Sequence, residues 1–166
     1  MKTIRNLLVV MLMLLMASGS WAGSTSSIYG DDNTMQGLTG KETRRIVYTV
    51  TFDSNAASPA VVGLDSITRT NGLKMSTVGG WWLFEVNTQY GATAPTADTD
   101  LYLYRYTANS RIDVLGGNGV DKIDAVTDNT FNPVTTSKPL VGNELLTFAN
   151  NAVNSAITYV IFWLYG

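Results

Sequence analysis

The ten residues before the C-terminal glycine place the strongest constraint on the fold. Residues 156–165 read Ala-Ile-Thr-Tyr-Val-Ile-Phe-Trp-Leu-Tyr. In a β-strand, successive side chains point to opposite faces. One face would carry Ile157, Tyr159, Ile161, Trp163 and Tyr165, and the other would carry Thr158, Val160, Phe162 and Leu164. Because both faces are largely apolar, this segment is predicted to be a central strand.

Two other segments alternate clearly. In residues 45–52, every second side chain from Ile46 to Phe52 is large and apolar, which predicts a half-buried strand. Residues 81–88 are predicted to form a core strand. Strict alternation would place Trp82, Phe84 and Val86 on one of its faces, with Trp81, Leu83, Glu85 and Asn87 on the other.

Shorter segments complete an all-β prediction. Asn71-Gly72 is a strong hairpin signal, because both residues tolerate positive φ. Further strands are predicted at residues 61–70, 73–78, 100–106, 111–115 and 143–149. About eight short strands separated by turns are typical of an antiparallel two-sheet sandwich, and a jelly-roll type fits best.

The composition excludes several functional classes. The 166 residues contain no Cys and no His. The chain therefore has no disulfide framework, no thiol nucleophile, no His base and no zinc site of the usual Cys/His type. Its 11 Lys and Arg and its 13 Asp and Glu are scattered along the chain. This charge balance leaves no electrostatic footprint for nucleic acid.

The N-terminal region predicts export. Lys2, Arg5, the apolar run at residues 7–17 and the small residues before Gly23 form the three parts of a signal peptide at residues 1–22. The apolar run is shorter than the roughly 20 residues of a membrane-spanning helix. A retained membrane anchor is the alternative.

We therefore expect a secreted, periplasmic or extracellular protein with no stable membrane insertion after cleavage of the signal. Residues 23–43 are polar and rich in turn formers, and they are predicted to be a flexible arm. Residues 44–166 are predicted to form a single β-sandwich domain.

A glycine-rich loop resembles a calcium-binding repeat. Residues 116–124 fit the nonapeptide pattern G-G-x-G-x-D-x-U-x, in which Asp121 would supply carboxylate oxygens. Such sites form between stacked repeats, and neither neighbouring stretch provides a second copy. We therefore expect a glycine hairpin loop and no cofactor, with Asp121 as the one candidate calcium ligand.

A Ser or Thr nucleophile without His would need a Lys or a free N-terminal amine, and no S-x-x-K or G-x-S-x-G pattern appears, so paired carboxylates are the main catalytic candidates. Glu85 is the notable acid, because it lies within an apolar strand, where burial would raise its pKa. A strand-surface position facing solvent or a partner is the more common outcome. We therefore predict that the chain is not an enzyme and has no catalytic residues.

Three tyrosines form the candidate binding site. Tyr102, Tyr104 and Tyr106 alternate along residues 100–106 and therefore share one face of a strand. Such a row could stack on sugars or contact a protein partner. Simple packing, within the chain or between subunits, is the alternative.

The order of features from residue 47 to residue 165 also carries a family resemblance. The relevant stretches are Tyr48-Thr49-Val50-Thr51-Phe52, Gly91-Ala92-Thr93-Ala94-Pro95-Thr96 before Asp100-Leu101-Tyr102, Asp113-Val114-Leu115-Gly116-Gly117, and Pro139-Leu140-Val141-Gly142 before Leu145-Leu146-Thr147-Phe148. Their order resembles that of small structural and hypothetical proteins encoded by tailed phages and prophages. The resemblance implies a β-sandwich that is virion-associated or acts in assembly, without enzyme activity.

These observations predict an exported, non-enzymatic β-sandwich with a structural or assembly role. It would associate with itself or with another structural protein, on a virion or a cell-surface assembly. The alternative is an extracellular glycan-binding module, assisted by calcium near Asp121.

Overall fold

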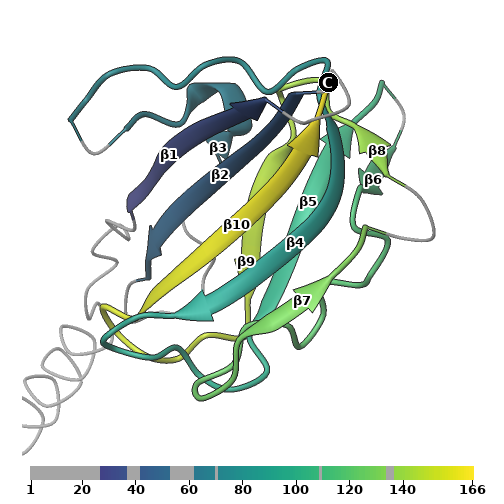
Figure 1. The fold of residues 1–166 in the computed structure, drawn as a ribbon. Helices are drawn as coiled ribbons and strands as arrows, with labels where there is room; N and C mark the ends of the chain where they lie inside the picture. Colours follow the sequence, from purple (N-terminus) through teal and green to yellow (C-terminus); the bar gives the residue numbers. More distant parts are fainter. Residues whose placement is uncertain (1–26, 37–41, 53–61, 70, 109, 134–136) are drawn as a thin grey trace, which may run out of the picture.

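A computed structural model describes residues 27–36, 42–52, 62–69, 71–108, 110–133 and 137–166. The predicted signal peptide at residues 1–22 lies outside these ranges. In the described residues, strands pair into two antiparallel sheets, of six and four strands. The predicted antiparallel two-sheet sandwich is therefore confirmed. The two sheets form the front and back layers of Figure 1.

The larger sheet, sheet A, has the order β1-β2-β10-β4-β7, with β8 also paired to β4. Its strands are β1 (Ser27–Gln36), β2 (Glu42–Thr51), β4 (Trp82–Tyr90), β7 (Asn129–Phe131), β8 (Lys138–Pro139) and β10 (Ile157–Tyr165). The smaller sheet, sheet B, has the order β3-β9-β5-β6. Its strands are β3 (Val62–Gly63), β5 (Asp100–Tyr106), β6 (Arg111–Asp113) and β9 (Leu145–Ala149).

Strand β10 lies in the middle of sheet A, as its two apolar faces predict. It pairs with β2 over its whole length and with β4 over most of it. In Figure 1 it is the yellow strand between the blue β2 and the teal β4. Val160, Phe162 and Leu164 point into the sandwich and are fully buried. Facing them, sheet B contributes Leu101, Leu103 and Phe148 to the same core cluster.

The predicted faces of β4 are wrong because the strand contains a β-bulge. Trp163 pairs with Glu85, but the next residue, Leu164, pairs with Leu83, so Phe84 has no partner in this ladder. An extra residue shifts the alternation by one place. As a result, Leu83 and Val86 both point into the core and are fully buried. Glu85 instead shares the outer face of sheet A with Trp163.

The predicted flexible arm at residues 23–43 is wrong for the part that the structure describes. Residues Ser27–Gln36 form β1, which pairs antiparallel with β2 from Ser27–Thr51 to Gln36–Glu42. The polar, turn-like composition misled the prediction, because a neighbouring strand supplies the backbone hydrogen bonds that stabilise β1. Met75 packs closely above Gly30, where a Cβ atom would collide with the Met75 sulfur.

The strands predicted at residues 61–70 and 73–78 are largely wrong. Among its described residues, 62–69, the first contains only β3 and a short 3₁₀ helix, η1 (Leu64–Ser66). A single bridge between Thr68 and Lys74 joins the two segments. Gly72 has a positive φ of 79°, but Asn71 does not, so the predicted turn with positive φ at both residues is only half right. An isolated parallel bridge between Tyr29 and Thr68 and side-chain contacts from Arg44 hold this region beside β1 and β2.

Tyr48 is a polar residue in the centre of the core. Its ring is fully buried and meets Phe162 edge to face, with ring centroids 5.1 Å apart. Among the described residues, its hydroxyl has no hydrogen-bond partner. Burial raises the pKa of the phenol above its ordinary value of 10.0, and nearby Arg44 only partly offsets this effect.

Tyr48→Phe is expected to stabilise the protein by about 1 kcal/mol at pH 7, because it removes a buried polar group without a partner. The raised pKa adds a pH dependence. The folded state keeps the phenol protonated, so its contribution is present below pH 10 and is lost as the pH rises further. Urea unfolding at about pH 7 and pH 10.5 should show a smaller alkaline loss for Tyr48→Phe than for wild type. Equal losses would contradict this account of Tyr48.

Candidate functional site

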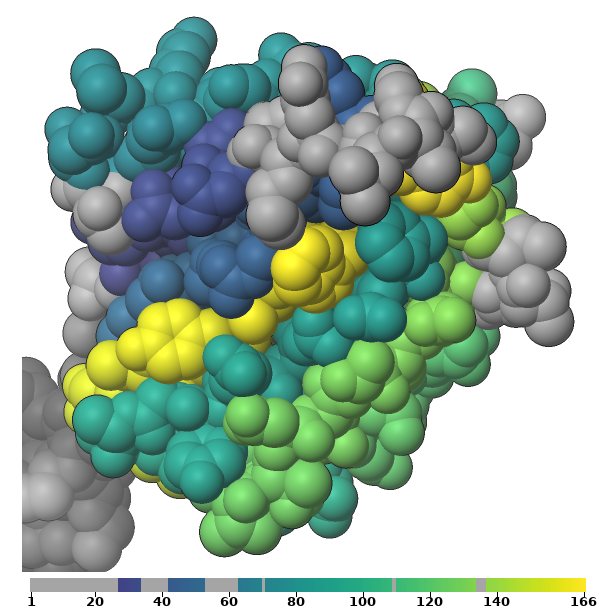
Figure 2. All heavy atoms as spheres, in the orientation of Figure 1, coloured from purple at the N-terminus to yellow at the C-terminus, as the bar shows by residue number. Residues whose placement is uncertain are grey.

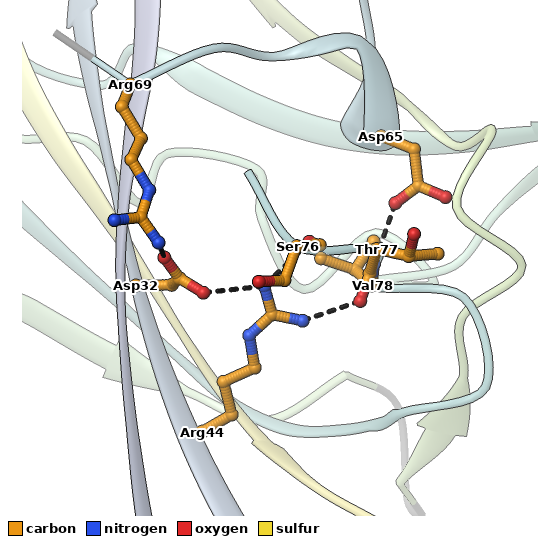
Figure 3. Close-up of polar contacts among 7 residues, drawn as sticks. All are labelled: Asp32, Arg44, Asp65, Arg69, Ser76, Thr77 and Val78. Carbon is orange, nitrogen blue, oxygen red and sulfur yellow. Dashed lines mark hydrogen bonds and ion pairs between the residues drawn. The ribbon is translucent and has the colours of Figure 1, made fainter. Parts of the chain in front are cut away.

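Arg44, on the inner face of β2, is the largest fully buried side chain among the described residues. The residue is 1% exposed. Its guanidinium donates to the backbone oxygens of Ser76 (2.7 Å) and Thr77 (2.6 Å), and to the Asp32 carboxylate on β1 (3.0 Å). Figure 3 shows Asp32 between Arg44 and Arg69, which forms a second ion pair with the same carboxylate. We call Asp32, Arg44 and Arg69 the arginine cluster.

The arginine cluster holds the loop at residues 76–77 against β2. A guanidinium can donate to several acceptors in one plane, so Arg44 binds two loop carbonyls and one carboxylate together. The Asp65 carboxylate receives the Val78 backbone N–H at 2.7 Å, which fixes the loop from the other side (Figure 3). Trp81 covers Arg44, with its ring centroid 5.6 Å from the guanidinium carbon. All these contacts are internal, so the cluster acts as a structural clamp.

Glu144 forms a second internal clamp. Its side chain is 0% exposed and accepts the backbone N–H groups of Val141 and Gly142, each at 2.8 Å. Arg105 on β5 forms an ion pair with the same carboxylate. The two guanidinium donors and two backbone donors satisfy an otherwise costly buried charge. This acid therefore positions a loop.

The tyrosine row lies on the outer face of sheet B. The rings of Tyr102 and Tyr104 stack with their centroids 5.3 Å apart. Arg111 on β6, which pairs with Tyr106 on β5, places its guanidinium carbon 4.2 Å from the Tyr104 centroid. The Tyr104 ring therefore lies between Tyr102 and Arg111. Tyr106 is 55% exposed and is the open member of the row.

Burial raises the pKa of both stacked tyrosines. For Tyr102, the hydrogen bond from its hydroxyl to Asp100 adds to this effect. For Tyr104, the positive charge of Arg111 partly opposes it. Both phenols therefore stay neutral well above neutral pH. The pair is a neutral packing unit flanked by one cation.

The outer face of sheet A carries a larger aromatic surface. Tyr165 on β10 stacks on Trp82 of β4, with ring centroids 6.2 Å apart, and contacts Phe84 at 5.9 Å. Trp163, two residues earlier, donates from Nε1 to Asn87 Oδ1 at 2.6 Å. Trp82 is 41% exposed. We call this set of residues, Trp82, Phe84, Trp163 and Tyr165, the aromatic face.

Two opposite charges flank the aromatic face at Trp163. The guanidinium carbon of Arg45 on β2 lies 5.8 Å from the Trp163 ring centroid. On the other side, Glu85 on β4 accepts a hydrogen bond from Asn87 at 3.3 Å. Glu85 is half-buried on this outer face. It thus lies in the surface position that sequence reasoning gave as the alternative to a buried catalytic acid. Figure 2 shows this side of the molecule, with β10 in yellow.

The glycine loop is packed against sheet B. Leu101 donates its backbone N–H to the Gly119 carbonyl at 2.8 Å, and a Cβ atom on Gly119 would collide with the Leu101 oxygen. The Asp121 side chain is exposed, and its backbone N–H donates to Asp100 Oδ1 at 3.0 Å. The described residues contain no group of three or more His, Cys, Asp or Glu that could hold a metal. Asp121 is therefore not part of such a group there.

Searches against known protein families, curated proteins and solved structures found no match. The resemblance to phage-encoded proteins therefore stays a prediction. Helices long and apolar enough to span a membrane are absent from the described ranges.

Sequence reasoning missed the arginine cluster and the aromatic face. The cluster joins Asp32 and Arg44, which lie on paired strands, to Arg69 in a distant loop. The sequence did carry a signal for Arg44: it is a charged residue on the strand face that otherwise carries Ile46 and other apolar side chains. The aromatic face was hidden because the bulge in β4 moves Glu85 onto the side of Trp82 and Phe84.

Arg44→Ala is expected to destabilise the protein by about 3–5 kcal/mol, because it leaves Asp32 and two loop carbonyls without their main donor. Arg69→Ala is the matched control. Its side chain is 34% exposed and binds only the far side of the same carboxylate. It should cost about 1 kcal/mol or less. The measurement is the free energy of unfolding in urea, and equal costs for both variants would contradict the clamp.

Proposed function

We propose that this protein is an exported, non-enzymatic β-sandwich with a structural or assembly role. It acts by associating with copies of itself or by docking on a larger virion or cell-surface assembly. The proposal of export depends on the signal-like pattern at residues 1–22. The association is supported by the aromatic face described above.

The aromatic face is the observation that carries the proposal. Interfaces between proteins are enriched in Trp, Tyr, Phe and Arg at their centres. Trp82, Phe84, Trp163 and Tyr165 share one side of two neighbouring strands, with Arg45 beside them. Large aromatic groups gathered on one sheet face mark contact sites more often than scattered apolar residues do. Covering this face would remove apolar surface from water without any change of fold.

The buried acids support a non-catalytic role. Asp32 is bound by Arg44 and Arg69, and Glu144 is bound by Arg105 and two backbone N–H groups. Asp100 accepts hydrogen bonds from Tyr102, Asn150 and the Asp121 backbone. Each of these carboxylates holds a loop or a neighbouring strand. A general acid or base would instead face a substrate.

Glycan binding is the second candidate, favoured by the 55% exposure of Tyr106 beside Arg111. It ranks lower because the Tyr104 ring already lies between Tyr102 and Arg111, and a sugar needs a free ring face. Binding on a glycan array that disappears in Tyr106→Ser, with unchanged thermal stability, would favour this candidate. Absence of binding on a broad array would count against it.

The test of the assembly role uses the protein recovered after expression of the full chain, with its N-terminus determined by mass spectrometry. Analytical ultracentrifugation is expected to show an oligomer or a concentration-dependent association. Trp82→Ser should shift the protein toward monomer by about tenfold or more in Kd, as expected for an interface aromatic. Tyr106→Ser, an exposed aromatic on the other sheet, is the control and should leave the association unchanged.

A wild-type protein that stays monomeric at high concentration and binds no other structural protein would overturn the assembly role. If Tyr106→Ser dissociates the oligomer and Trp82→Ser does not, the contact between copies lies on sheet B instead.

A further inference from the structure

We infer that the partner of the aromatic face is a second copy of this chain, packed sheet on sheet about a two-fold axis that runs along β10. This inference depends on the proposed assembly role and names its partner and geometry. It comes from the arrangement of charge around Trp163. Two-fold dimers are the commonest symmetric assembly, and each contact in them occurs twice.

Opposite charges flank Trp163 in register. Trp163 pairs with Arg45 of β2 on one side and with Glu85 of β4 on the other. All three side chains point out of the sandwich, because their neighbours Arg44, Phe162 and Val86 are buried inside it. Within the described residues, neither Arg45 nor Glu85 belongs to an ion pair, so a cation and an anion stand on opposite sides of an aromatic centre.

A two-fold axis along β10 pairs these charges. In a face-to-face dimer the axis lies between the two sheets, parallel to them. Rotation about an axis along β10 exchanges the β2 side with the β4 side and keeps each row at the same height. Arg45 of one copy then faces Glu85 of the other, and the contact is repeated across the axis. An axis across the strands at the height of Trp163 would instead place Arg45 opposite Arg45, which like-charge repulsion disfavours.

The rows beside Trp163 fit the same axis. Ile161 lies between Val47 and Asn87, and Tyr159 lies between Thr49 and Gln89. In the dimer, Val47 of one copy would therefore face Asn87 of the other, and Thr49 would face Gln89. None of these side chains is charged. The row on the axis consists of Tyr159, Ile161, Trp163 and Tyr165, of which Ile161 is already buried and the three aromatic residues are half-buried.

This distribution matches that of a protein interface, with an apolar centre and a polar rim. Packed sheets lie about 10 Å apart and within about 30° of parallel, a gap that extended Arg and Glu side chains can bridge.

Charge reversal tests the geometry. The variants Arg45→Glu and Glu85→Arg each create two like-charge contacts in the dimer, and each should raise the Kd of self-association about tenfold or more. An equal mixture of the two variants should form a mixed dimer. In it, the new glutamate of one copy faces the new arginine of the other, and the retained Glu85 faces the retained Arg45.

The double variant Arg45→Glu with Glu85→Arg should also self-associate near the wild-type level, because it exchanges the two charges without creating a like-charge contact. Lys74→Glu, at an exposed position, is the control for the net-charge change of Arg45→Glu. Circular dichroism melts of every variant establish that the fold is retained.

The outcomes separate this inference from the assembly role. Rescue in the mixture and in the double variant supports the two-fold dimer. A wild-type oligomer that both single variants leave intact overturns the dimer geometry while the assembly role survives. Loss of association in the single variants without any rescue also overturns it and points to a different partner surface. A wild-type monomer overturns the dimer, and the assembly role falls with it only if the protein also binds no other structural protein.

Discussion

The position of β10 in the centre of sheet A is the constraint on which the rest of the structure depends. One side of this strand, with Val160, Phe162 and Leu164, meets sheet B and forms the core. Its other side carries Trp163 and Tyr165 on the outer face of the sheet. Burial of a large apolar side chain is worth about 1.5–3 kcal/mol, so both faces gain from being covered. The sandwich covers the first side completely; on the second, Ile161 is buried, while Trp163 and Tyr165 are only half-buried. The proposed dimer would cover this second side.

The bulge in β4 links the core to the outer face. By inserting Phe84 into the strand, it lets Leu83 and Val86 both enter the core. It also places Phe84 and Glu85 on the outer face, beside Tyr165 and Asn87. Bulges often redirect a side chain at a functional position. Here the redirection produces the charge pattern around Trp163. Independently of the bulge, the arginine cluster and Asp65 hold the loop at residues 76–78 in place.

Much of the fold could be predicted from local alternation, since a period of two residues identifies β2, β5, β9 and β10 directly. The failures have physical causes. Strand β1 contains Gly30-Asp31-Asp32-Asn33, and only its pairing with β2 reveals it as a strand. The faces of β4 required knowledge of its register against β10. The tyrosine row was predicted correctly as one face, but its stacking under Arg111 depends on the pairing of β5 with β6.

The central claim is that association covers the outer face of β10 and β4. Hydroxyl-radical footprinting at rising protein concentration, read by mass spectrometry, tests it most directly. The account predicts that oxidation of Trp82, Trp163 and Tyr165 falls as the protein associates, while that of Tyr106 on the opposite sheet stays constant. Unchanged oxidation of all four residues across the association range would contradict the claim. So would protection confined to Tyr106.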